Sequence, residues 1–300
     1  MIYWNREQEC ERLFLEGGPF YIVTTENLPW LLFACERDFM DGANMVAVSV
    51  HELALRLLAD VEMNNHLHFV FEGAYEQVLV FVERFRKMMS RYQLAKGNPS
   101  LNRWDIQIKS IDNLKYLRNA LLYVFRNPSV AMRNCTPLGY KWSSAQLMFN
   151  ENLYRYSQGV PYNSLTYREK RLIAHSRELI LPDSYRVLDG MILRECFVDY
   201  KRAESFFESA YQFFYQLGRK VESDAETARW IGEKILLPNE DVFGIVSAWY
   251  NVQKTSLLST NQRLEAARRM KAELMSNNKQ IAQVLRIPLE QVDQFFPVAQ

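Results

Sequence analysis

Two of the four histidines in this chain, His66 and His68, lie two residues apart within a strand-like run from Ala59 to Gly73. Successive side chains of a β-strand point to opposite faces of a sheet, so residues i and i+2 project from the same face. We therefore expect the two imidazoles to lie side by side, an arrangement that can hold a divalent metal ion. A pair of histidines on a plain sheet surface fits the same short pattern, so other residues must separate the two interpretations.

A tyrosine and an asparagine, Tyr123 and Asn127, are four residues apart in a second segment. The run from Ile111 to Pro128 predicts a helix, with Asp112 as its N-cap and Pro128 marking its end. Residues four apart on a helix lie one turn from each other on the same face, so the phenol and the amide are expected to be neighbours. A tyrosine in apolar helical surroundings is also commonly a core residue with a hydrogen-bonded hydroxyl, and the spacing leaves both interpretations open.

The composition predicts a soluble protein with two domains and no strong global charge. The 300 residues are 48% hydrophobic, which allows a sizeable core. The 36 Lys and Arg residues nearly balance the 35 Asp and Glu residues, so a nucleic acid would need a local basic patch. No apolar run reaches the ~20 residues of a membrane span, and no signal peptide is recognisable, so we expect a cytoplasmic protein without a membrane partner. The four cysteines are widely spaced, which argues against a disulfide framework or a structural zinc site.

Hydrophobic patterns in the first half predict a mixed unit of strands and helices. The expected elements are strands at 19–25 and 30–36, a helix at 48–58, strands on either side of Asn64 and Asn65, and a long helix at 75–96. On the long helix, Arg84, Lys87 and Arg91 recur at spacings of three and four beside the apolar stripe. Solvated charge is the usual explanation of such a ridge, and contact with nucleic-acid phosphates is the alternative.

The second half is predicted to be helical, with one break at 181–193 that is interpreted as a turn-rich connector. An expected helix at 197–221 carries an aromatic stripe that is interpreted as core and not as a base-stacking platform. The stripe consists of Phe197, Tyr200, Phe206, Phe207, Tyr211 and Phe214. Near the end, residues 277–297 have the spacing of a helix-turn-helix motif. Its second helix carries Glu290 and Asp293 but no basic residue, so base readout would rest on Gln291 and Gln294. A DNA-reading module and a plain helical hairpin fit this segment equally well.

Three segments in a fixed order resemble the REP-associated tyrosine transposases, a branch of the bacterial HUH single-strand DNA transposases. They are EMNNHLHFVF around the two histidines, YVFRNPSVA starting at Tyr123, and YKWSSAQLMF at Tyr140–Phe149. The family shows Met-Pro-Asn-His-x-His, Tyr-Ile-x-x-Asn-Pro and Trp-Ser-Ser segments in that order, and the resemblance covers about residues 15 to 150. The chain departs from the family pattern at Asn64, Val124 and Ser129, and none of these departures removes a reacting group.

The resemblance implies a fold, a metal site and a reaction. It implies an α+β fold, with a ferredoxin-like antiparallel sheet and helices on one face in residues 1–150, followed by an all-helical region at 151–300. It also implies that His66 and His68 bind Mg²⁺ or Mn²⁺, with Asn127 as a candidate third ligand, and that Tyr123 is the nucleophile. A cation that withdraws charge from a phosphodiester helps a tyrosine hydroxyl attack it, and the covalent phosphotyrosine stores the bond energy for rejoining.

Two classes of function remain after this resemblance. The preferred one is a transposase-like enzyme that cleaves and rejoins single-stranded hairpin DNA, and the alternative is a non-catalytic DNA-binding or regulatory protein derived from such a transposase. The intact histidine pair and tyrosine favour the enzyme. We expect the two imidazoles to face the Tyr123 hydroxyl across a shallow groove that is open to solvent. The basic surface that binds DNA beside this groove is expected to draw on Arg84, Lys87, Arg91, Arg118 and Arg126.

Overall fold

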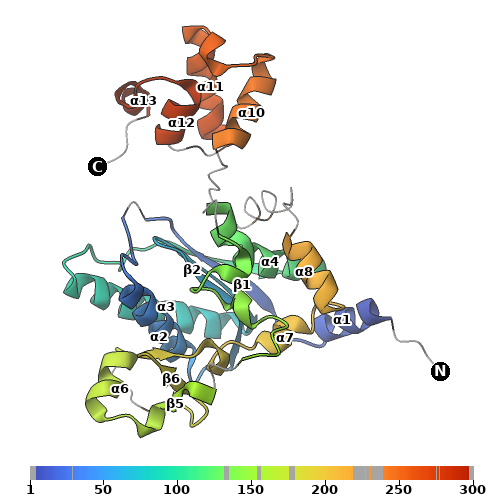
Figure 1. The fold of residues 1–300 in the computed structure, drawn as a ribbon, viewed down its shortest axis with the longest axis vertical. Coiled ribbons are helices and arrows are strands. Elements are labelled where there is room, and N and C mark those ends of the chain that lie inside the picture. Colours follow the sequence, from blue (N-terminus) through green and yellow to red (C-terminus); the bar gives the residue numbers. More distant parts are fainter. Residues whose placement is uncertain are drawn as a thin grey trace. The chain divides into compact units, whose positions relative to one another are not determined.

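The computed structural model describes residues 5–28, 30–131, 135–153, 157–175, 180–218, 227, 230, 239–274, 276 and 278–296. The chain divides into two compact units, Met1–Thr227 and Ala228–Gln300 (Figure 1). Among the helices within those described ranges, none has the length and apolar character needed to cross a membrane.

The first unit is built on a four-stranded antiparallel sheet with the strand order β2-β3-β1-β4. Its strands are β1 (Phe20–Thr25), β2 (Leu55–Glu62), β3 (Leu67–Gly73) and β4 (Ile106–Ile111). Helix α2 (Glu36–Val50) connects β1 to β2, and α3 (Tyr75–Ala95) connects β3 to β4. This βαββαβ order with a central β1–β3 pair is the ferredoxin-like arrangement, so the predicted fold class is confirmed.

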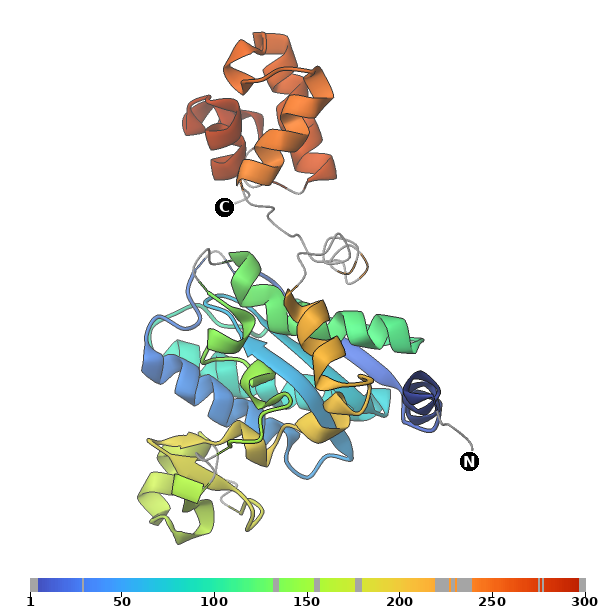
Figure 2. The same ribbon diagram turned by 45° about the vertical axis from the view of Figure 1, so that its right-hand side comes forward.

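Both faces of this sheet are covered, each by different helices (Figure 2). On β3, the Phe69 ring packs against Phe81 and Phe85 of α3, with ring centroids 5.3 and 5.7 Å apart. The neighbouring His68 points to the opposite face, where α4 (Leu114–Ala131) lies. The two crossover helices thus share one face, as predicted, and α4 occupies the other.

Two of the predicted elements in the first half are wrong. Residues 30–35 form no strand, although Leu32 and Phe33 are buried, because this stretch enters the core as a loop before α2. The helix predicted at 48–58 is instead the end of α2 followed by the start of β2, and Glu52 between them has a positive φ of 64°. Strand β2 is buried on both faces and bulges between Leu57 and Ala59, so it lacks the alternation that distinguishes a strand from a helix.

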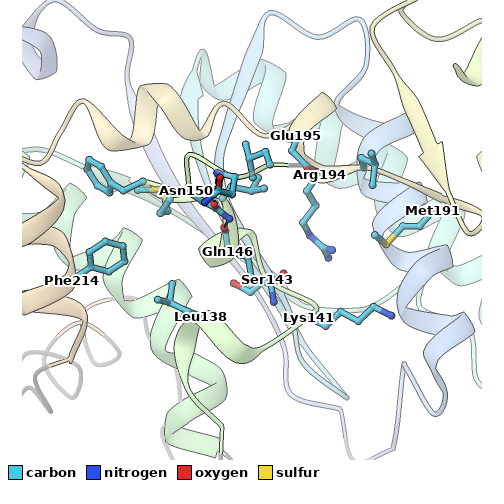
Figure 3. Close-up of a pocket in the computed structure, with 15 residues that line it drawn as sticks. Leu138, Lys141, Ser143, Gln146, Asn150, Met191, Arg194, Glu195 and Phe214 are labelled. Atoms are coloured by element: carbon cyan, nitrogen blue, oxygen red, sulfur yellow. Dashed lines mark hydrogen bonds between the residues drawn. The ribbon is translucent and has the colours of Figure 1, made fainter. Parts of the chain in front are cut away.

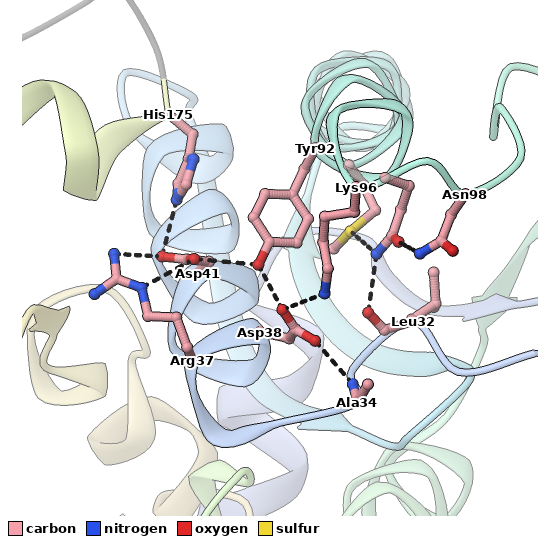
Figure 4. A network of polar contacts seen from close by, with 11 residues as sticks. Leu32, Ala34, Arg37, Asp38, Asp41, Tyr92, Lys96, Asn98 and His175 are labelled. Carbon is pink, nitrogen blue, oxygen red and sulfur yellow. Dashed lines mark hydrogen bonds and ion pairs between the residues drawn. The ribbon is translucent and has the colours of Figure 1, made fainter.

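A polar network ties the start of α2 to the end of α3 (Figure 4). The Tyr92 hydroxyl hydrogen-bonds to the carboxylates of Asp38 at 2.7 Å and Asp41 at 3.2 Å. Lys96 pairs with Asp38, and His175 lies 2.9 Å from Asp41. Burial and the two carboxylates raise the pKa of Tyr92, so its hydroxyl stays protonated and remains a donor. These contacts fix the two helices against each other on the face away from His68.

Segments that follow α4 in the chain complete the first unit by covering the outer edge of β2. The backbone N–H of Glu62 donates to the Trp142 carbonyl at 2.9 Å, and the N–H of Asp199 donates to the Leu57 carbonyl at 2.7 Å. An edge strand with unpaired backbone groups is a site of unwanted pairing, so these contacts protect it. The compact unit consequently extends to residue 227, beyond the boundary predicted at residue 150.

The remaining elements of the first unit are short. The helices and helical turns are α1 (Arg6–Leu15), η1 (Pro137–Gly139), η2 (Ser144–Leu147), η3 (Tyr162–Ser164), α6 (Tyr167–Ala174), η4 (Arg194–Cys196), α7 (Tyr200–Glu204) and α8 (Ala210–Gly218). A small three-stranded sheet is formed by β5 (Val160–Pro161), β6 (Arg186–Leu188) and β7 (Met191–Ile192). No sheet was predicted in this half, although β6 and β7 lie within the connector predicted at 181–193. The helix predicted at 197–221 is divided into the two helices α7 and α8, and its last three residues lie outside the described part of the chain.

The second unit is a small helical bundle in its described residues. It contains α10 (Asn239–Tyr250), η5 (Thr255–Leu257), α11 (Thr260–Glu273), α12 (Asn278–Leu285) and α13 (Leu289–Phe295). These elements share one apolar core, formed by Val242, Val246, Leu258, Ala266, Ala267, Met270, Leu274, Ile281, Ala282, Val284, Leu285 and Val292. The C-terminal region is therefore helical, as predicted.

Candidate functional site

The structure brings the histidine pair, the tyrosine and the asparagine into one cluster. The rings of His66 and His68 have centroids 4.9 Å apart, and the ring of His68 is 5.5 Å from that of Tyr123. The Asn127 amide nitrogen lies 3.0 Å from His68 Nε2 and donates to the Tyr123 hydroxyl oxygen at 3.5 Å. The side chains that sequence spacing placed on one strand and one helix therefore meet on a single face of the sheet.

Strand pairing adds a fifth polar residue that the sequence did not reveal. Thr24 on β1 stands opposite His68 on β3, and its hydroxyl oxygen is 3.3 Å from His68 Nδ1. At the other histidine, Asn65 Oδ1 lies 2.9 Å from His66 Nδ1. Each imidazole is thus oriented through Nδ1 by a neighbouring polar group. The hydrogen-bond partner of one ring nitrogen determines which of the two nitrogens carries the proton.

Helix α4 places Tyr123 and Asn127 against the sheet, although it does not end where it was predicted to end. Pro128 lies inside the helix, which continues to Ala131. A proline has no backbone N–H, so the carbonyl of Val124 cannot receive the usual helical hydrogen bond from residue 128. The prediction of Pro128 as the end of the helix is therefore wrong. The continued helix keeps Asn127 one turn beyond Tyr123 on the same face.

The cluster is buried, which contradicts the expectation of a groove open to solvent. His68 is 0% exposed, Tyr123 is 4% exposed and His66 is 9% exposed. Asn127 is only half-buried and is the most accessible of the four. Burial lowers the pKa of His68 to about 3, because a charged imidazolium loses its hydration there. At neutral pH this ring is consequently uncharged and keeps a nitrogen lone pair.

The donor atoms in this cluster are few. No group of three or more His, Cys, Asp or Glu side chains able to hold a metal ion occurs within the described residues. The ligands that His66, His68 and Asn127 offer are two neutral imidazoles and an amide. Such a set is short of protein ligands, so a bound cation would need positions filled by water or substrate.

The structure does not bring the five predicted DNA-contacting residues to one surface. Arg84, Lys87 and Arg91 are on α3, which covers the face of the sheet opposite to His68. Lys87 and Arg91 are exposed, whereas Arg84 is half-buried and donates to the His51 carbonyl at 3.0 Å. These three side chains do not border the histidine cluster, and their contact with nucleic-acid phosphates stays a prediction.

Arg118 and Arg126 are on α4 itself but are buried, with 9% and 5% exposure. Arg118 makes a two-point ion pair with Glu7, at 2.6 and 2.8 Å, and donates to the Phe206 carbonyl at 2.6 Å. Arg126 donates to the Gln216 carbonyl at 2.9 Å. Both guanidinium groups thus hold α4 to α1, to the segment after α7 and to α8. The sequence pattern missed this, because their partners are about 90 residues or more away along the chain.

The Trp-Ser-Ser segment supports the sheet and does not enter the cluster. The Ser144 hydroxyl accepts a hydrogen bond from the Asp60 N–H at 2.8 Å, and the Ser143 hydroxyl donates to the Asp60 carbonyl at 3.3 Å. The Trp142 ring stacks on Phe39 of α2, with centroids 4.9 Å apart. This segment therefore fixes the edge of β2, the neighbour of β3, which carries His68 and is directly preceded by His66.

In the second unit, the predicted helix-turn-helix segment forms α12, a turn at Arg286–Pro288 and α13. Of its predicted range, residues 277 and 297 lie outside the described part of the chain. Gln291 and Gln294 are exposed on α13, and Asp293 accepts a hydrogen bond from Asn278 at 2.8 Å. The geometry of two short packed helices is present, and a DNA-reading role for it stays a prediction.

Comparisons with known proteins give one distant similarity. No family model matches the chain, and no curated protein matches it. A solved structure entitled "Structure of the REP associates tyrosine transposase bound to a REP hairpin" is 17% identical, over 46% of this chain and 82% of that chain, with a TM-score of 0.34. At this level of identity and TM-score the similarity is distant, so the function is inferred from the site geometry.

Proposed function

We propose that this protein is a transposase-like DNA strand transferase that cleaves and rejoins single-stranded hairpin DNA through Tyr123. The observation that carries the proposal is the convergence of Tyr123 and Asn127 from α4 with His68 of β3 and His66, the residue directly before β3. A nucleophile, two potential metal ligands and a third polar group within contact distance are the parts that phosphoryl transfer to a tyrosine needs.

The residues present carry donor atoms that suit a divalent cation. His66, His68 and Asn127 would hold it: Nδ1 of each histidine faces a neighbouring polar group, so Nε2 would be the ligand atom, and Asn127 would turn its amide oxygen toward the cation in place of the nitrogen that now faces His68 Nε2. Nitrogen donors favour Mn²⁺ over Mg²⁺, since affinity rises along the first transition series and Mg²⁺ prefers oxygen. When bound, such a cation would withdraw charge from a non-bridging phosphate oxygen.

The reaction assigns definite roles to the side chains of this chain. The Tyr123 oxygen forms a bond to phosphorus as the bond from phosphorus to one deoxyribose oxygen breaks. The phenolic proton leaves Tyr123, and the departing DNA oxygen gains a proton, so the strand ends in a free hydroxyl and a tyrosyl phosphodiester. Attack of a DNA hydroxyl on this diester reverses the step and joins the strand. Asn127 orients the Tyr123 hydroxyl through the hydrogen bond at 3.5 Å.

One observation favours a second candidate, a non-catalytic DNA-binding protein derived from such an enzyme. Tyr123 and His68 are only 4% and 0% exposed. A phosphodiester can therefore reach them only if the residues that pack around the cluster move aside. A protein that keeps these residues but no longer undergoes the motion that exposes them would have the same structure. The two candidates differ in covalent chemistry, which can be measured.

The test is formation of a denaturation-resistant protein–DNA adduct. Full-length protein is incubated with single-stranded DNA that carries a hairpin, with Mg²⁺ or Mn²⁺, and the products are separated in denaturing gels. We expect an adduct with the wild type, and no adduct with Tyr123→Phe, which removes only the attacking oxygen. The double variant His66→Ala, His68→Ala should also form none, while its DNA affinity without metal is retained.

Tyr116→Phe is the matched control, because Tyr116 lies on the same helix but is 42% exposed. This variant should form the adduct at the wild-type level. An adduct that survives Tyr123→Phe contradicts the assignment of the nucleophile. Tight DNA binding without an adduct across a broad set of hairpins would establish the non-catalytic alternative.

A further inference from the structure

Helix α8 exposes aromatic side chains where a solvated helix face ordinarily carries charged ones. It has no charged residue, and its Tyr211, Phe214 and Tyr215 are 78%, 40% and 54% exposed. These positions are three and four residues apart and form one face, whereas Phe213 and Leu217 on the other side are buried. The prediction that Tyr211 and Phe214 are core residues is therefore wrong. Contiguous exposed apolar surface of this kind marks an interaction site.

The exposed rings are arranged for stacking. Tyr211 and Tyr215 have ring centroids 6.1 Å apart and planes only 14° from parallel. Phe214, between them in sequence, has its ring 6.2 Å from that of Phe149. Flat aromatic faces in a row bind the flat faces of nucleobases without regard to base sequence.

A pocket of about 480 Å³ adjoins this helix and includes Phe214 in its lining (Figure 3). Phe214 and Leu138 lie at one end of the pocket and Met191 at the other, with Gln146 and Asn150 between them. The volume is within the range of sites for small organic groups. Its walls thus combine apolar surface with neutral amide side chains.

The polar groups of the pocket suit a base edge better than a phosphate. Within the described residues, the half-buried Gln146 side chain makes no hydrogen bond, so its amide has an unused donor and an unused acceptor. The two cations are already engaged by carboxylates: Lys141 pairs with Glu36, and Arg194 pairs with Asp60. An amide that both donates and accepts matches the edges of unpaired bases.

The pocket is also linked to the sheet that carries the histidine cluster. Ser143, which lines it, forms a bridge with Val61 on β2, and Val61 stands opposite His68 in the β2–β3 register. The pocket therefore lies at the edge of the strand next to β3, within the same compact unit. A strand of nucleotides that reaches Tyr123 has bases to place on either side of the scissile phosphate.

We propose that the exposed face of α8 and this pocket bind unpaired bases of single-stranded DNA. Bases stack on Tyr211, Phe214 and Tyr215, and the edge of one base hydrogen-bonds to Gln146. This inference rests on the proposed function, because the bound strand is the one presented to Tyr123. It assigns DNA binding to neutral and aromatic groups in a protein whose net charge is only +1.

The test uses full-length protein, metal-free buffer and fluorescence anisotropy of labelled single strands. The double variant Tyr211→Ala, Tyr215→Ala is compared with the wild type on a normal strand and on an equally long strand with abasic sites. We expect the double variant to bind the normal strand roughly tenfold to a hundredfold more weakly, since each lost stack costs about tenfold. On the abasic strand, the variant and the wild type should bind equally, because the phosphates are unchanged.

The matched control is Tyr167→Ala, since Tyr167 is 65% exposed on α6, away from this pocket. Wild-type affinity of the double variant for the normal strand would overturn the proposal. A change in oligomeric state by light scattering, without loss of DNA binding, would overturn it in favour of an interface between copies. The outcomes for Tyr123 are separate, because binding without adduct formation contradicts the nucleophile assignment and leaves this binding site intact.

Discussion

The two faces of strand β3 are equally buried but differ in chemistry. Phe69 is 1% exposed and packs among the aromatic rings of α3, while its neighbour His68 is 0% exposed and lies among polar groups beneath α4. Burial of aromatic rings stabilises the folded state. Burial of polar groups costs their free energy of hydration unless hydrogen bonds within the protein replace the bonds to water. The aromatic face therefore accounts for stability, and the polar face is the one that needs a functional explanation.

The largest expected effect is on the aromatic face. Phe81→Ala removes a fully buried ring that contacts both Phe69 and Phe71, and we expect it to lower the free energy of unfolding by about 3–5 kcal/mol. Urea denaturation measures this loss. Leu79→Ala on the outer side of the same helix is the control and should change stability by less than about 0.5 kcal/mol. A loss below about 1 kcal/mol for Phe81→Ala would remove the contrast between the two faces.

A pH-dependent effect is expected where the aromatic face holds an ion cluster. Glu62 is buried with Asp60 and Arg194, and burial raises its pKa to about 8 from 4.5. The folded state thus binds the Glu62 proton more tightly than the unfolded state, so its contribution is fully present below about pH 4.5 and is lost as the pH rises through about 8. The loss between pH 5 and pH 8 should be on the order of 3 kcal/mol.

Glu62→Gln removes this titration while keeping the shape of the side chain. Urea denaturation at several pH values should show a flatter stability profile for the variant, with a gain over the wild type that grows above pH 6. Parallel profiles for the two proteins would show that Glu62 is ionised in the folded state at neutral pH, paired with Arg194 in the manner of Asp60.

The smallest expected effect is on the polar face. His68→Leu and Asn127→Leu each leave a buried partner without its hydrogen bond, so each should cost about 1–3 kcal/mol. The double variant should cost less than the sum of the two, with a coupling energy of about 0.5–3 kcal/mol. A double-mutant cycle by urea denaturation measures it. Strict additivity would mean that the 3.0 Å contact between the two side chains is not maintained in solution.

The sequence predicted the geometry within each pair of the polar cluster from local spacing, whereas the meeting of the two pairs was predicted only from the family resemblance. His66 and His68 are two apart on a strand, and Tyr123 and Asn127 are four apart on a helix, so the period of each element decides their directions. Thr24 was missed, because it reaches His68 only through the pairing of β1 with β3, 44 residues away. Its contribution depends on strand register, and no local pattern reports register.

Burial and long-range pairing account for the other differences. The burial of the cluster depends on the residues that pack around it, and the sequence did not predict which residues these are. Arg118 and Arg126 looked like surface cations on α4, but their partners come from α1, α8 and the segment after α7. The run at 30–36 has the apolar and aromatic composition of a strand, which is why a strand was predicted there. In the structure its buried residues enter the core from a loop.

The most direct test of the central claim is to locate the covalent bond. Wild-type protein is incubated with hairpin DNA and Mn²⁺, digested with trypsin and nuclease, and analysed by mass spectrometry. Trypsin cleaves after Arg118, so Tyr116 and Tyr123 fall on different peptides. We predict a nucleotide on the peptide that contains Tyr123, despite its 4% exposure, and none on the peptide with the more exposed Tyr116. A nucleotide on Tyr116, or on no tyrosine at all, would contradict the assignment of the buried cluster as the catalytic site.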